Sequence, residues 1–419
     1  MIASKITSLL NKFPAITRLC IAFSGGLDST VLLHALAKNM PSKSVTKIMA
    51  IHINHHLSAH ADDWAAHCKS FALNLGINYV EQAIDLSKIQ GNIEAIAREK
   101  RYDAFKTCMD ENTALLTGHH QDDQAETVLL QLMRGSGVAG LAAMPEVKTF
   151  ATGYLLRPFL DLNRTMLQMY AVEHQLTWIE DESNQQLCFD RNYIRHQVLP
   201  PLQSRWTHAS KLIARTAQHA AQAQTLATEV AQQDLIKIID KFNRINIIQL
   251  QSYSEARQIN VIRFWLQQVA QLNLEEKQLN EVFHTVINSR EDAMPCFRIA
   301  SWEVRRYQQQ LYLCQSKQEK IDTNWSDDWN VKKDYRLPFN LGILIAEEYQ
   351  PFIKNAQPLR ICFRQLGQKV LLKNSMQHYK LKKLMQAWFI PPWERDFVPL
   401  VFCGERLISA GIYYFEGVN

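Results

Sequence analysis

The segment that decides the fold lies near the amino end and reads LCIAFSGGLDSTVLLHAL over residues 19–36. Five apolar residues lead into a polar turn with two adjacent glycines, and the residues after the glycines carry an apolar stripe with helical spacing. This order predicts a buried strand, a sharp turn and a helix. Paired glycines let backbone amides approach a ligand closely, and the first turn of a helix favours an anion. We therefore predict a phosphate-binding turn at residues 24–29.

Asp28 indicates which kind of phosphate ligand this turn would bind. A carboxylate repels a phosphate unless a cation such as Mg²⁺ lies between them, so Asp28 predicts a magnesium-bound nucleotide. We expect the pyrophosphate of ATP to lie against the whole turn, which consists of Ser24, Gly25, Gly26, Leu27, Asp28 and Ser29. The segment lacks the G-x-x-x-x-G-K-[ST] pattern of P-loop ATPases. It resembles the signature of the N-type ATP pyrophosphatases, which cleave ATP between its α and β phosphates. The structural alternative is an ordinary strand-to-helix turn in which Asp28 is only a helix residue.

The bulk composition describes a globular chain of more than one domain. Of its 419 residues, 47% are hydrophobic and 21% are charged, and this length predicts two or three domains. We find no run of about 18 apolar residues, so we expect no membrane partner. The eight cysteines form no C-x-x-C pair, which disfavours zinc knuckles, iron–sulfur ligation and a secreted disulfide framework. We therefore expect a reducing cytoplasm, and the net charge of +5 is compatible with a polyanionic partner.

Strand and helix patterns alternate through the first half of the chain. Apolar runs predict strands at residues 18–23, 47–53, 77–83 and 114–117. Helical patterns follow them at residues 30–40, 61–75, 92–109 and 122–133. This alternation is typical of an α/β fold, a Rossmann-like parallel sheet with helices on both faces.

The rest of the chain predicts two further domains. We expect the sheet domain over residues 1–216, a mainly helical domain over 217–320 and a small α+β domain over 330–419. A long Ala- and Gln-rich helix at about residues 202–233 leaves the first domain. The helical domain ends in strand-like segments at 296–299 and 311–314, and the polar stretch 315–328 is the best linker.

A second cluster, GHHQDDQAET at residues 118–127, follows the strand predicted at 114–117. Ligands of parallel sheets bind outside the carboxyl ends of the strands, so this cluster should meet the glycine turn in one crevice. On a helix, Asp123 and Glu126 lie three residues apart and His119 and Asp123 four apart, so each pair would share a face. One alternative is a metal site made of both histidines and the carboxylates. The other is a capped helix start, with its acidic residues favoured by the helix dipole.

Several further motifs carry a resemblance that covers most of the chain. They are RGSGVAGL at 134–141, RPFL at 157–160, WIEDESN at 178–184, DRNYIR at 190–195 and LPPL at 199–202. Later segments add REDA at 290–293, WEVRRY at 302–307, KLKKLM at 380–385 and IPPWER at 390–395. Together with the glycine turn, they resemble the tRNA(Ile)-lysidine synthetase family of the PP-loop superfamily. One departure is Leu366, which stands where a second glycine is often found and puts the local turn in doubt.

The resemblance implies a two-step ligation. ATP adenylates the 2-carbonyl oxygen of the wobble cytidine in an isoleucine tRNA with a CAU anticodon, and pyrophosphate leaves. The ε-amine of free L-lysine then attacks that ring carbon and displaces AMP. The resulting lysidine pairs with A and changes the tRNA from methionine to isoleucine identity. In this scheme, residues 1–216 form the catalytic domain and the two later domains bind tRNA.

The resemblance also implies roles for individual residues. Asp28 and Asp123 would hold Mg²⁺, and Asp123, Glu126 and His119 are candidates for handling lysine and its amine. Arg191 and Arg195 would neutralise the adenylate or the tRNA backbone.

Two further groups of basic residues are candidates for binding phosphate groups. Arg98 and Arg101 lie three apart on one predicted helix and would contact phosphate of ATP or tRNA, unless they form a solvated basic face. In the terminal domain, tRNA contacts are expected at Lys380, Lys382 and Lys383.

Two rival functions remain at this stage. One is another ATP pyrophosphatase, such as a tRNA 2-thiolation enzyme, GMP synthetase or NAD synthetase, and the lack of C-x-x-C counts against the thiolation enzymes. The other is a non-catalytic tRNA-binding protein, which would have no need for so many carboxylates at a phosphate site. The sequence leaves the oligomeric state open, a homodimer included.

Overall fold

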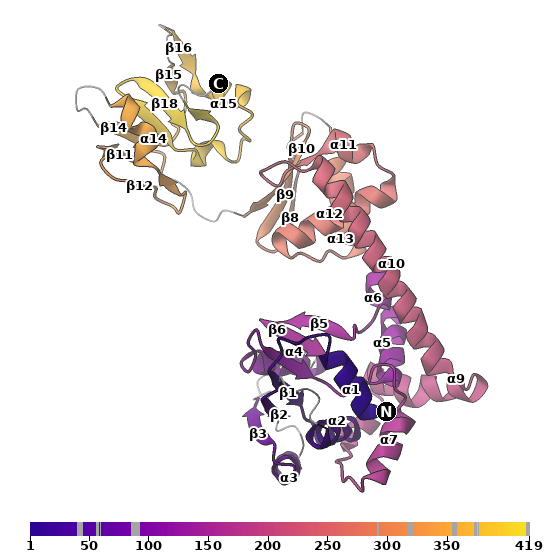
Figure 1. Ribbon diagram of the computed structural model, residues 1–419. Coiled ribbons are helices and arrows are strands. Elements are labelled where there is room, and N and C mark those ends of the chain that lie inside the picture. Colours follow the sequence, from indigo (N-terminus) through magenta and orange to yellow (C-terminus); the bar gives the residue numbers. More distant parts are fainter. Residues whose placement is uncertain are drawn as a thin grey trace. The chain divides into compact units, whose positions relative to one another are not determined.

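The computed structural model describes residues 1–39, 45–55, 58, 60–84, 93–290, 293–316, 322–353, 358–372, 375 and 377–415. The chain divides into two compact units, Met1–Glu229 and Val230–Asn419. Figure 1 shows the first in indigo to magenta and the second in pink to yellow. The three-domain boundaries expected from the sequence stay a prediction.

A six-stranded sheet forms the centre of the described part of the first unit, in the order β3-β2-β1-β4-β6-β5 (Figure 1). Its strands are β1 (Arg18–Ala22), β2 (Lys47–Asn54), β3 (Asn78–Ala83), β4 (Thr113–Leu116), β5 (Val147–Phe150) and β6 (Gly153–Leu156). The strands from β3 to β6 run parallel, and β5 pairs antiparallel with β6. The predicted parallel sheet is confirmed, with one correction at this edge. The two residues between β5 and β6 are too few for a crossover, so these strands form a hairpin.

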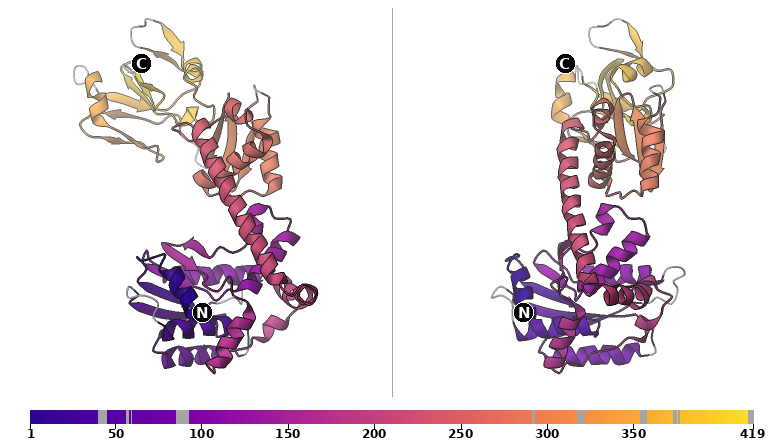
Figure 2. Two further views of the ribbon diagram at one scale, coloured as in Figure 1. Left: turned by 45° about the vertical axis from the view of Figure 1, so that its right-hand side comes forward. Right: turned by 90° about the vertical axis from the view of Figure 1, so that its right-hand side faces the viewer.

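Helices cover both faces of this sheet, as the views in Figure 2 show. Side chains alternate along the strands, so Leu19 and Ile21 enter one apolar core while Cys20 enters the other. The first core receives side chains from α1 (Ile2–Leu10), α2 (Leu27–Lys38), α3 (Ala61–Asn74) and α7 (Arg164–Glu173). The second receives Phe105 from α4 (Ile93–Lys106). One boundary is corrected: α2 begins at Leu27 and not at residue 30, so Asp28 and Ser29 belong to its first turn.

The strand order places a topological switch point between β1 and β4. From β1 the chain proceeds to β2 and β3 on one side, and then returns to form β4 on the other side. Loops after two such strands diverge and leave a crevice at the carboxyl edge of the sheet. The glycine turn follows β1 and α5 (Gln121–Met133) follows β4, so both predicted motifs lie at this crevice.

The remaining helices of the first unit follow the sheet. They are α6 (Val138–Leu141), α8 (Asp190–Tyr193), a π-helical turn (Ile194–Val198), α9 (Leu199–Arg205) and α10 (Ala209–Ile238), with a 3₁₀ turn at Glu182–Gln185. The single helix expected at 202–233 is therefore two helices, and α10 continues past Glu229 into the second unit. The pair Pro200 and Pro201 explains the π-helical turn. Neither proline has an amide hydrogen to donate to the preceding turn, so the regular ladder is interrupted there.

The second unit begins with helices packed on a small sheet. The helices are α11 (Ile247–Gln251), α12 (Glu255–Ala270) and α13 (Glu276–Val282), followed by a π-helical turn (Phe283–Ile287). The sheet has the order β7-β10-β9-β8, formed by β7 (Ile245–Asn246), β8 (Cys296–Ile299), β9 (Trp302–Tyr307) and β10 (Gln310–Gln315). The two expected strand segments are confirmed, and β9 is an additional strand that the sequence did not reveal.

A seven-stranded sheet completes the described part of the second unit. Its strands are β11 (Ser326–Trp329), β14 (Leu359–Cys362), β15 (Lys369–Leu371), β16 (His378–Lys380), β17 (Leu400–Cys403), β18 (Arg406–Ala410) and β19 (Tyr414–Phe415). A two-stranded sheet of β12 (Tyr335–Arg336) and β13 (Ile343–Leu344), the helices α14 (Ala346–Tyr349) and α15 (Leu381–Ala387), and 3₁₀ turns at Gln350–Phe352 and Arg395–Phe397 accompany it.

Two expectations about the second unit need correction or completion. The linker expected at 315–328 is shorter at both ends, because Gln315 belongs to β10 and β11 begins at Ser326; residues 317–321 lie outside the described residues. The turn at Leu366 forms without a second glycine: Leu366 is 97% exposed, and Gly367 takes the left-handed conformation with a φ of +76°.

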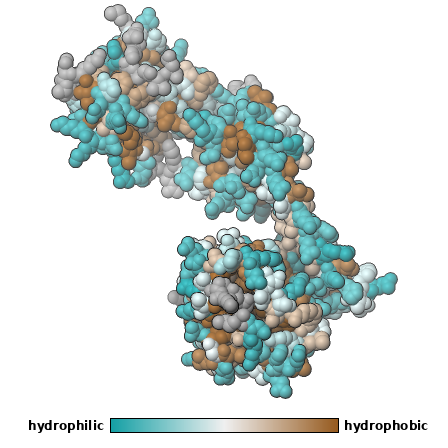
Figure 3. Space-filling model, in the orientation of Figure 1, coloured by the Kyte–Doolittle hydropathy of each residue, from teal (hydrophilic) through white to brown (hydrophobic). Residues whose placement is uncertain are grey.

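No helix in the described ranges combines the length and apolar character needed to cross a bilayer. The face of the molecule in Figure 3 is largely hydrophilic, with hydrophobic residues in separate patches.

Candidate active site

The glycine turn and the acidic cluster are in direct contact through Gly118. A Cβ atom on Gly118 would lie 2.8 Å from the carbonyl carbon of Asp28 and 2.9 Å from its oxygen. Backbone atoms cannot yield as a flexible side chain can, so this approach requires glycine. The two segments therefore meet at one edge of the sheet, as their places after parallel strands predict.

Contacts with Ile179 and Thr30 fix the conformation of the turn at Gly25. Gly25 has a φ of +82°, and a Cβ there would lie 2.5 Å from Cδ1 of Ile179. The Ile179 amide donates to the Gly25 carbonyl oxygen at 2.9 Å, and the Thr30 hydroxyl donates to the same oxygen at 3.2 Å. At the front, Ser24 Oγ and Ser29 Oγ lie 3.1 Å apart. No side chain caps α2, whose N-cap is Gly26, so its first amides keep the character of an anion site.

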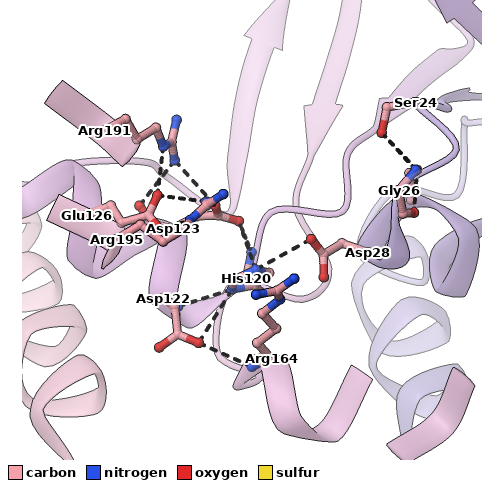
Figure 4. Close-up of polar contacts among 11 residues, drawn as sticks. Ser24, Gly26, Asp28, His120, Asp122, Asp123, Glu126, Arg164, Arg191 and Arg195 are labelled. Atoms are coloured by element: carbon pink, nitrogen blue, oxygen red, sulfur yellow. Dashed lines mark hydrogen bonds and ion pairs between the residues drawn. The ribbon is translucent and has the colours of Figure 1, made fainter. Parts of the chain in front are cut away.

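His120 connects the turn with the acidic helix (Figure 4). Its Nε2 atom lies 3.5 Å from Asp28 Oδ2 and 3.5 Å from Asp123 Oδ2. The residue is 2% exposed and is the N-cap of α5. Its Nδ1 accepts from the Asp122 amide at 3.2 Å, and its own amide donates to Asp123 Oδ2 at 3.0 Å. The alternative of a capped helix start is thus correct for α5, with His120 in the capping position.

Burial and the nearby carboxylates shift the pKa of His120 in opposite directions. Burial disfavours the imidazolium, but the nearby carboxylates, Asp123 first and then Asp28, raise the pKa of His120 to about 9. When Nδ1 is protonated it can no longer accept from the Asp122 amide, and the carboxylate nearest to it is that of Asp122, whose Oδ2 lies 3.9 Å away. From the sequence, His120 was considered only as a ligand of the alternative metal site, and its place as the N-cap of α5 was not predicted.

Asp123 and Glu126 are paired with the two arginines that follow 65 to 72 residues later. Arg191 Nε donates to Glu126 Oε2 at 2.8 Å, and Arg195 Nε donates to Glu126 Oε1 at 2.6 Å. Both arginines also reach Asp123 Oδ1, at 3.4 Å and 3.2 Å. The Glu126 side chain is only 1% exposed. Burial opposes ionisation of Asp123, but His120 and Arg191 hold its pKa well below the usual range.

The spacing of the two arginines explains how both reach one carboxylate. Arg191 lies in α8 and Arg195 in the π-helical turn that continues it, four residues later, so both side chains lie on a similar face. Both guanidinium groups contact Glu126 (Figure 4). The four residues form a buried network with two positive and two negative charges.

His119 lies outside this network. α5 begins at Gln121, so His119 is not helical, and the expectation that it shares a helix face with Asp123 is wrong. Its Nδ1 lies 2.7 Å from Thr117 Oγ1. Burial, only partly offset by Asp123, combines with three arginines, Arg157, Arg191 and Arg98, to lower the pKa of His119 to about 3. His119 is therefore neutral at neutral pH, mainly because it is buried, with Asp123 and the three arginines acting on it in opposite directions.

The other predicted basic residues are placed differently. Arg98 lies over the ring of Tyr102 at 5.2 Å, whereas Arg101 donates to His55 Nε2 at 3.3 Å, so the two arginines have different partners. Lys380, Lys382 and Lys383 are exposed and belong to the second unit, around the start of α15.

The predicted metal ligands can be judged from their surroundings. Within the described ranges, no group of three or more His, Cys, Asp or Glu residues is arranged to hold a metal, so the metal site made of protein ligands alone finds no support there. Asp28 Oδ1 is buried and has no hydrogen-bond partner among the described residues. Mg²⁺ commonly binds one or two carboxylates together with phosphate oxygens. Asp28, with this unpaired oxygen, suits a Mg²⁺ that arrives with a nucleotide, whereas both oxygens of Asp123 already contact His120, Arg191 or Arg195.

Family comparisons cover most of the chain. A PP-loop domain matches residues 1–202, a TilS substrate binding domain matches 246–312, and a TilS substrate C-terminal domain matches 359–415. The first of these contains the glycine turn, the acidic helix and both arginines that pair with it.

Curated relatives match over nearly the full length. A tRNA(Ile)-lysidine synthase from Coxiella burnetii (strain RSA 493 / Nine Mile phase I) is 38% identical over 410 residues, which are 97% of this chain and 91% of that protein. Another, from Legionella pneumophila (strain Paris), is 39% identical over 394 residues, covering 93% of this chain and 90% of that protein. Among solved structures, a U34-tRNA thiolase NcsA from Methanococcus maripaludis with its [4Fe-4S] cluster has a TM-score of 0.43 and 17% identity, over 52% of this chain and 76% of that one.

Proposed function

Because the chain belongs to the tRNA(Ile)-lysidine synthase family, we propose that it joins L-lysine to the wobble cytidine of tRNA(Ile) with a CAU anticodon. ATP is the energy source: it adenylates the 2-oxygen of the cytidine, pyrophosphate leaves, and the ε-amine of lysine displaces AMP. The observation that carries this proposal is the contact of the glycine turn with the acidic helix, through Gly118 and His120. That contact puts phosphate-binding amides beside carboxylates suited to a metal ion.

The turn would bind the leaving pyrophosphate. Ser24, Ser29 and the uncapped first amides of α2 donate where negative charge develops as the α–β bond breaks. Asp28 and Asp123 would hold Mg²⁺, which neutralises that charge when bound. The unpaired Asp28 Oδ1 supports this assignment.

The arginine pair would receive the adenylated base. In the arrangement described here, Arg191 and Arg195 are neutralised by Glu126 and Asp123. We assign Glu126 the part of a positioning residue, because both its oxygens are engaged and it is almost fully buried. Asp123 is the more accessible carboxylate and can be shared between the metal ion and an arginine.

Lysine must lose a proton from its ε-amine before it attacks, because an ammonium has no lone pair. A base with a pKa of about 3, such as His119, is a weak proton acceptor at neutral pH. Burial and the three arginines that lower the pKa of His119 would also lower the pKa of an amine beside it, against the opposite effect of Asp123. We therefore propose that the arginines favour the neutral amine and that His119 accepts its hydrogen bond.

Incubation with labelled lysine, ATP and separate tRNAs tests the function. We expect label in tRNA(Ile) with a CAU anticodon, one AMP per lysine, and no label in methionine tRNAs. Release of pyrophosphate without incorporation of lysine would indicate another ATP pyrophosphatase. Binding of tRNA with no ATP cleavage would indicate the non-catalytic alternative.

The eight free cysteines suit a reducing cytoplasm, where this substrate occurs.

A further inference from the structure

Arg157 is a buried cation that the proposed roles leave unused. It follows β6 directly and is 4% exposed. Its Nη1 donates to the Pro145 carbonyl oxygen at 2.7 Å, and Tyr102 is near enough to raise the pKa of Arg157. Its Nε has no hydrogen-bond partner among the described residues. None of the ion pairs found in those residues includes Arg157.

The charge of Arg157 is therefore poorly compensated. Burial lowers the pKa of Arg157, with a further lowering by Arg98. By contrast, Arg191 and Arg195 are each paired with two carboxylates. Arg306 of the second unit, also buried, uses all three nitrogens on oxygen acceptors. A buried guanidinium with an unmade hydrogen bond is costly, and such groups concentrate at functional sites.

A second arginine shares the same tyrosine. Arg98 Nη2 donates to the Tyr102 hydroxyl at 3.5 Å, and both Arg98 and Tyr102 are near enough to Arg157 to act on its pKa. A phenolic oxygen that accepts from a guanidinium group keeps its own proton available to donate. Two like charges thus lie near one tyrosine, an arrangement that an anion would stabilise.

The topology puts this group at the active-site edge of the sheet. β4 and β6 are parallel neighbours, His119 lies three residues after β4, and Arg157 comes immediately after β6. Both therefore lie at carboxyl ends of strands. Arg157 and Arg98 are also close enough to His119 to act on its charge.

We propose that Arg157, Arg98 and the Tyr102 hydroxyl form an oxyanion site beside His119. The oxyanion is either the carboxylate of the lysine substrate or a phosphate of the tRNA. This proposal rests on the proposed function, because lysine and tRNA are the candidate ligands only if the protein joins lysine to tRNA. Guanidinium groups bind both kinds of oxyanion through paired N–H donors.

Arg157→Gln separates the two sources. If the carboxylate binds, wild-type enzyme prefers lysine over lysinamide by about 10-fold to 100-fold in kcat/KM, and the variant loses this preference. If a phosphate binds, the variant keeps the preference, but its affinity for tRNA falls about 10-fold and depends less on salt. Arg98→Gln should act in the same direction. Arg306→Gln is the matched control, because it removes a buried arginine from the second unit and should leave the lysine preference unchanged.

A melting experiment without ATP or tRNA does not depend on turnover. We expect inorganic phosphate and lysine to raise Tm more than 1,5-diaminopentane does, and Arg157→Gln to remove part of the shift. Wild-type protein that ligates no lysine would refute the proposed function, and the phosphate shift would still decide on the oxyanion site. If the variant has unchanged lysine preference, tRNA affinity and ligand-induced shifts, the oxyanion site is refuted.

Discussion

Gly118 lies against the backbone of Asp28, and this contact joins segments that follow two different strands. The close approach of these two segments therefore depends on a residue without a side chain. The carboxylates of Asp28 and Asp123 can face His120 only while the two backbones remain this close.

Gly118→Ala should separate these segments. The added Cβ would lie 2.8 Å from Asp28 backbone atoms, so the turn must shift. We expect a loss of about 100-fold in the ligation rate and a loss of about 1–3 kcal/mol in unfolding free energy. Gly137→Ala is the control, because nothing lies within 4 Å of its Cβ position. Equal rates for the two variants would contradict the role of the contact.

Glu126→Gln tests whether Glu126 positions the arginines or acts as a free base. Removing its charge leaves Arg191 and Arg195 incompletely paired in a buried place. The free energy of unfolding of the first unit should fall by about 3–5 kcal/mol, as measured by denaturant titration. Glu146→Gln, which removes an exposed partner of Lys12, should cost no more than about 1 kcal/mol. A free base would instead lose activity with stability unchanged.

Residues of this site differ in how far the sequence could predict them. The turn at Gly25 and Gly26 has local signals, namely adjacent glycines after an apolar run. Glu126 forms ion pairs with Arg191 and Arg195, which follow it by more than 60 residues, and no local sequence pattern predicts these pairs. Arg157 stood in a recognised motif, but its burial and unpaired Nε depend on tertiary packing.

At the scale of elements, the parallel sheet was predictable because its strands are apolar runs separated by amphipathic helices. β9 was not, because it carries Glu303, Arg305 and Arg306 among its six residues. These charges are compatible with a strand because they pair with one another and with neighbouring groups. Arg298 and Arg305 donate to the two oxygens of Glu303, at 2.9 Å and 2.7 Å.

Glu303 should make the second unit sensitive to acid. Burial opposes ionisation, but bonds from Arg305, Ser316 and Arg298 keep the pKa of Glu303 below its usual 4.5. A depressed carboxyl pKa adds stability that is fully present well above pH 4.5 and is lost as pH falls through the folded-state pKa. Glu303→Gln should therefore lower Tm at pH 7 and reduce its decline between pH 5 and about pH 3. A parallel decline in variant and wild type would contradict this role.

At the scale of the whole molecule, the residues proposed for ATP and for tRNA lie in different units. The residues proposed for ATP and lysine belong to Met1–Glu229, and the exposed lysines of α15 belong to Val230–Asn419. This division makes nucleotide binding and tRNA binding separable by mutation.

Replacing Lys380, Lys382 and Lys383 with alanine should weaken tRNA binding without changing the Kd for ATP. Each lost phosphate contact reduces the slope of log K against log salt by about 0.7 to 0.9, so the triple variant should lose about 2 to 3 units. Alanine at Lys332 and Lys333, also exposed in the second unit, is the control. An unchanged salt slope would show that these three lysines form only a solvated surface.

The support of Gly25 by Ile179 has a consequence for biosynthesis. The side chain that backs the turn is encoded more than 150 codons after it, and the same residue supplies the amide bound to the Gly25 carbonyl. A nascent chain that has left the ribosome only as far as β6 holds every residue of the turn and Cys68 beside Gly25, but it lacks Ile179. The ability to bind a nucleotide should therefore appear late in translation, when the segment around Ile179 has emerged and packs against the turn.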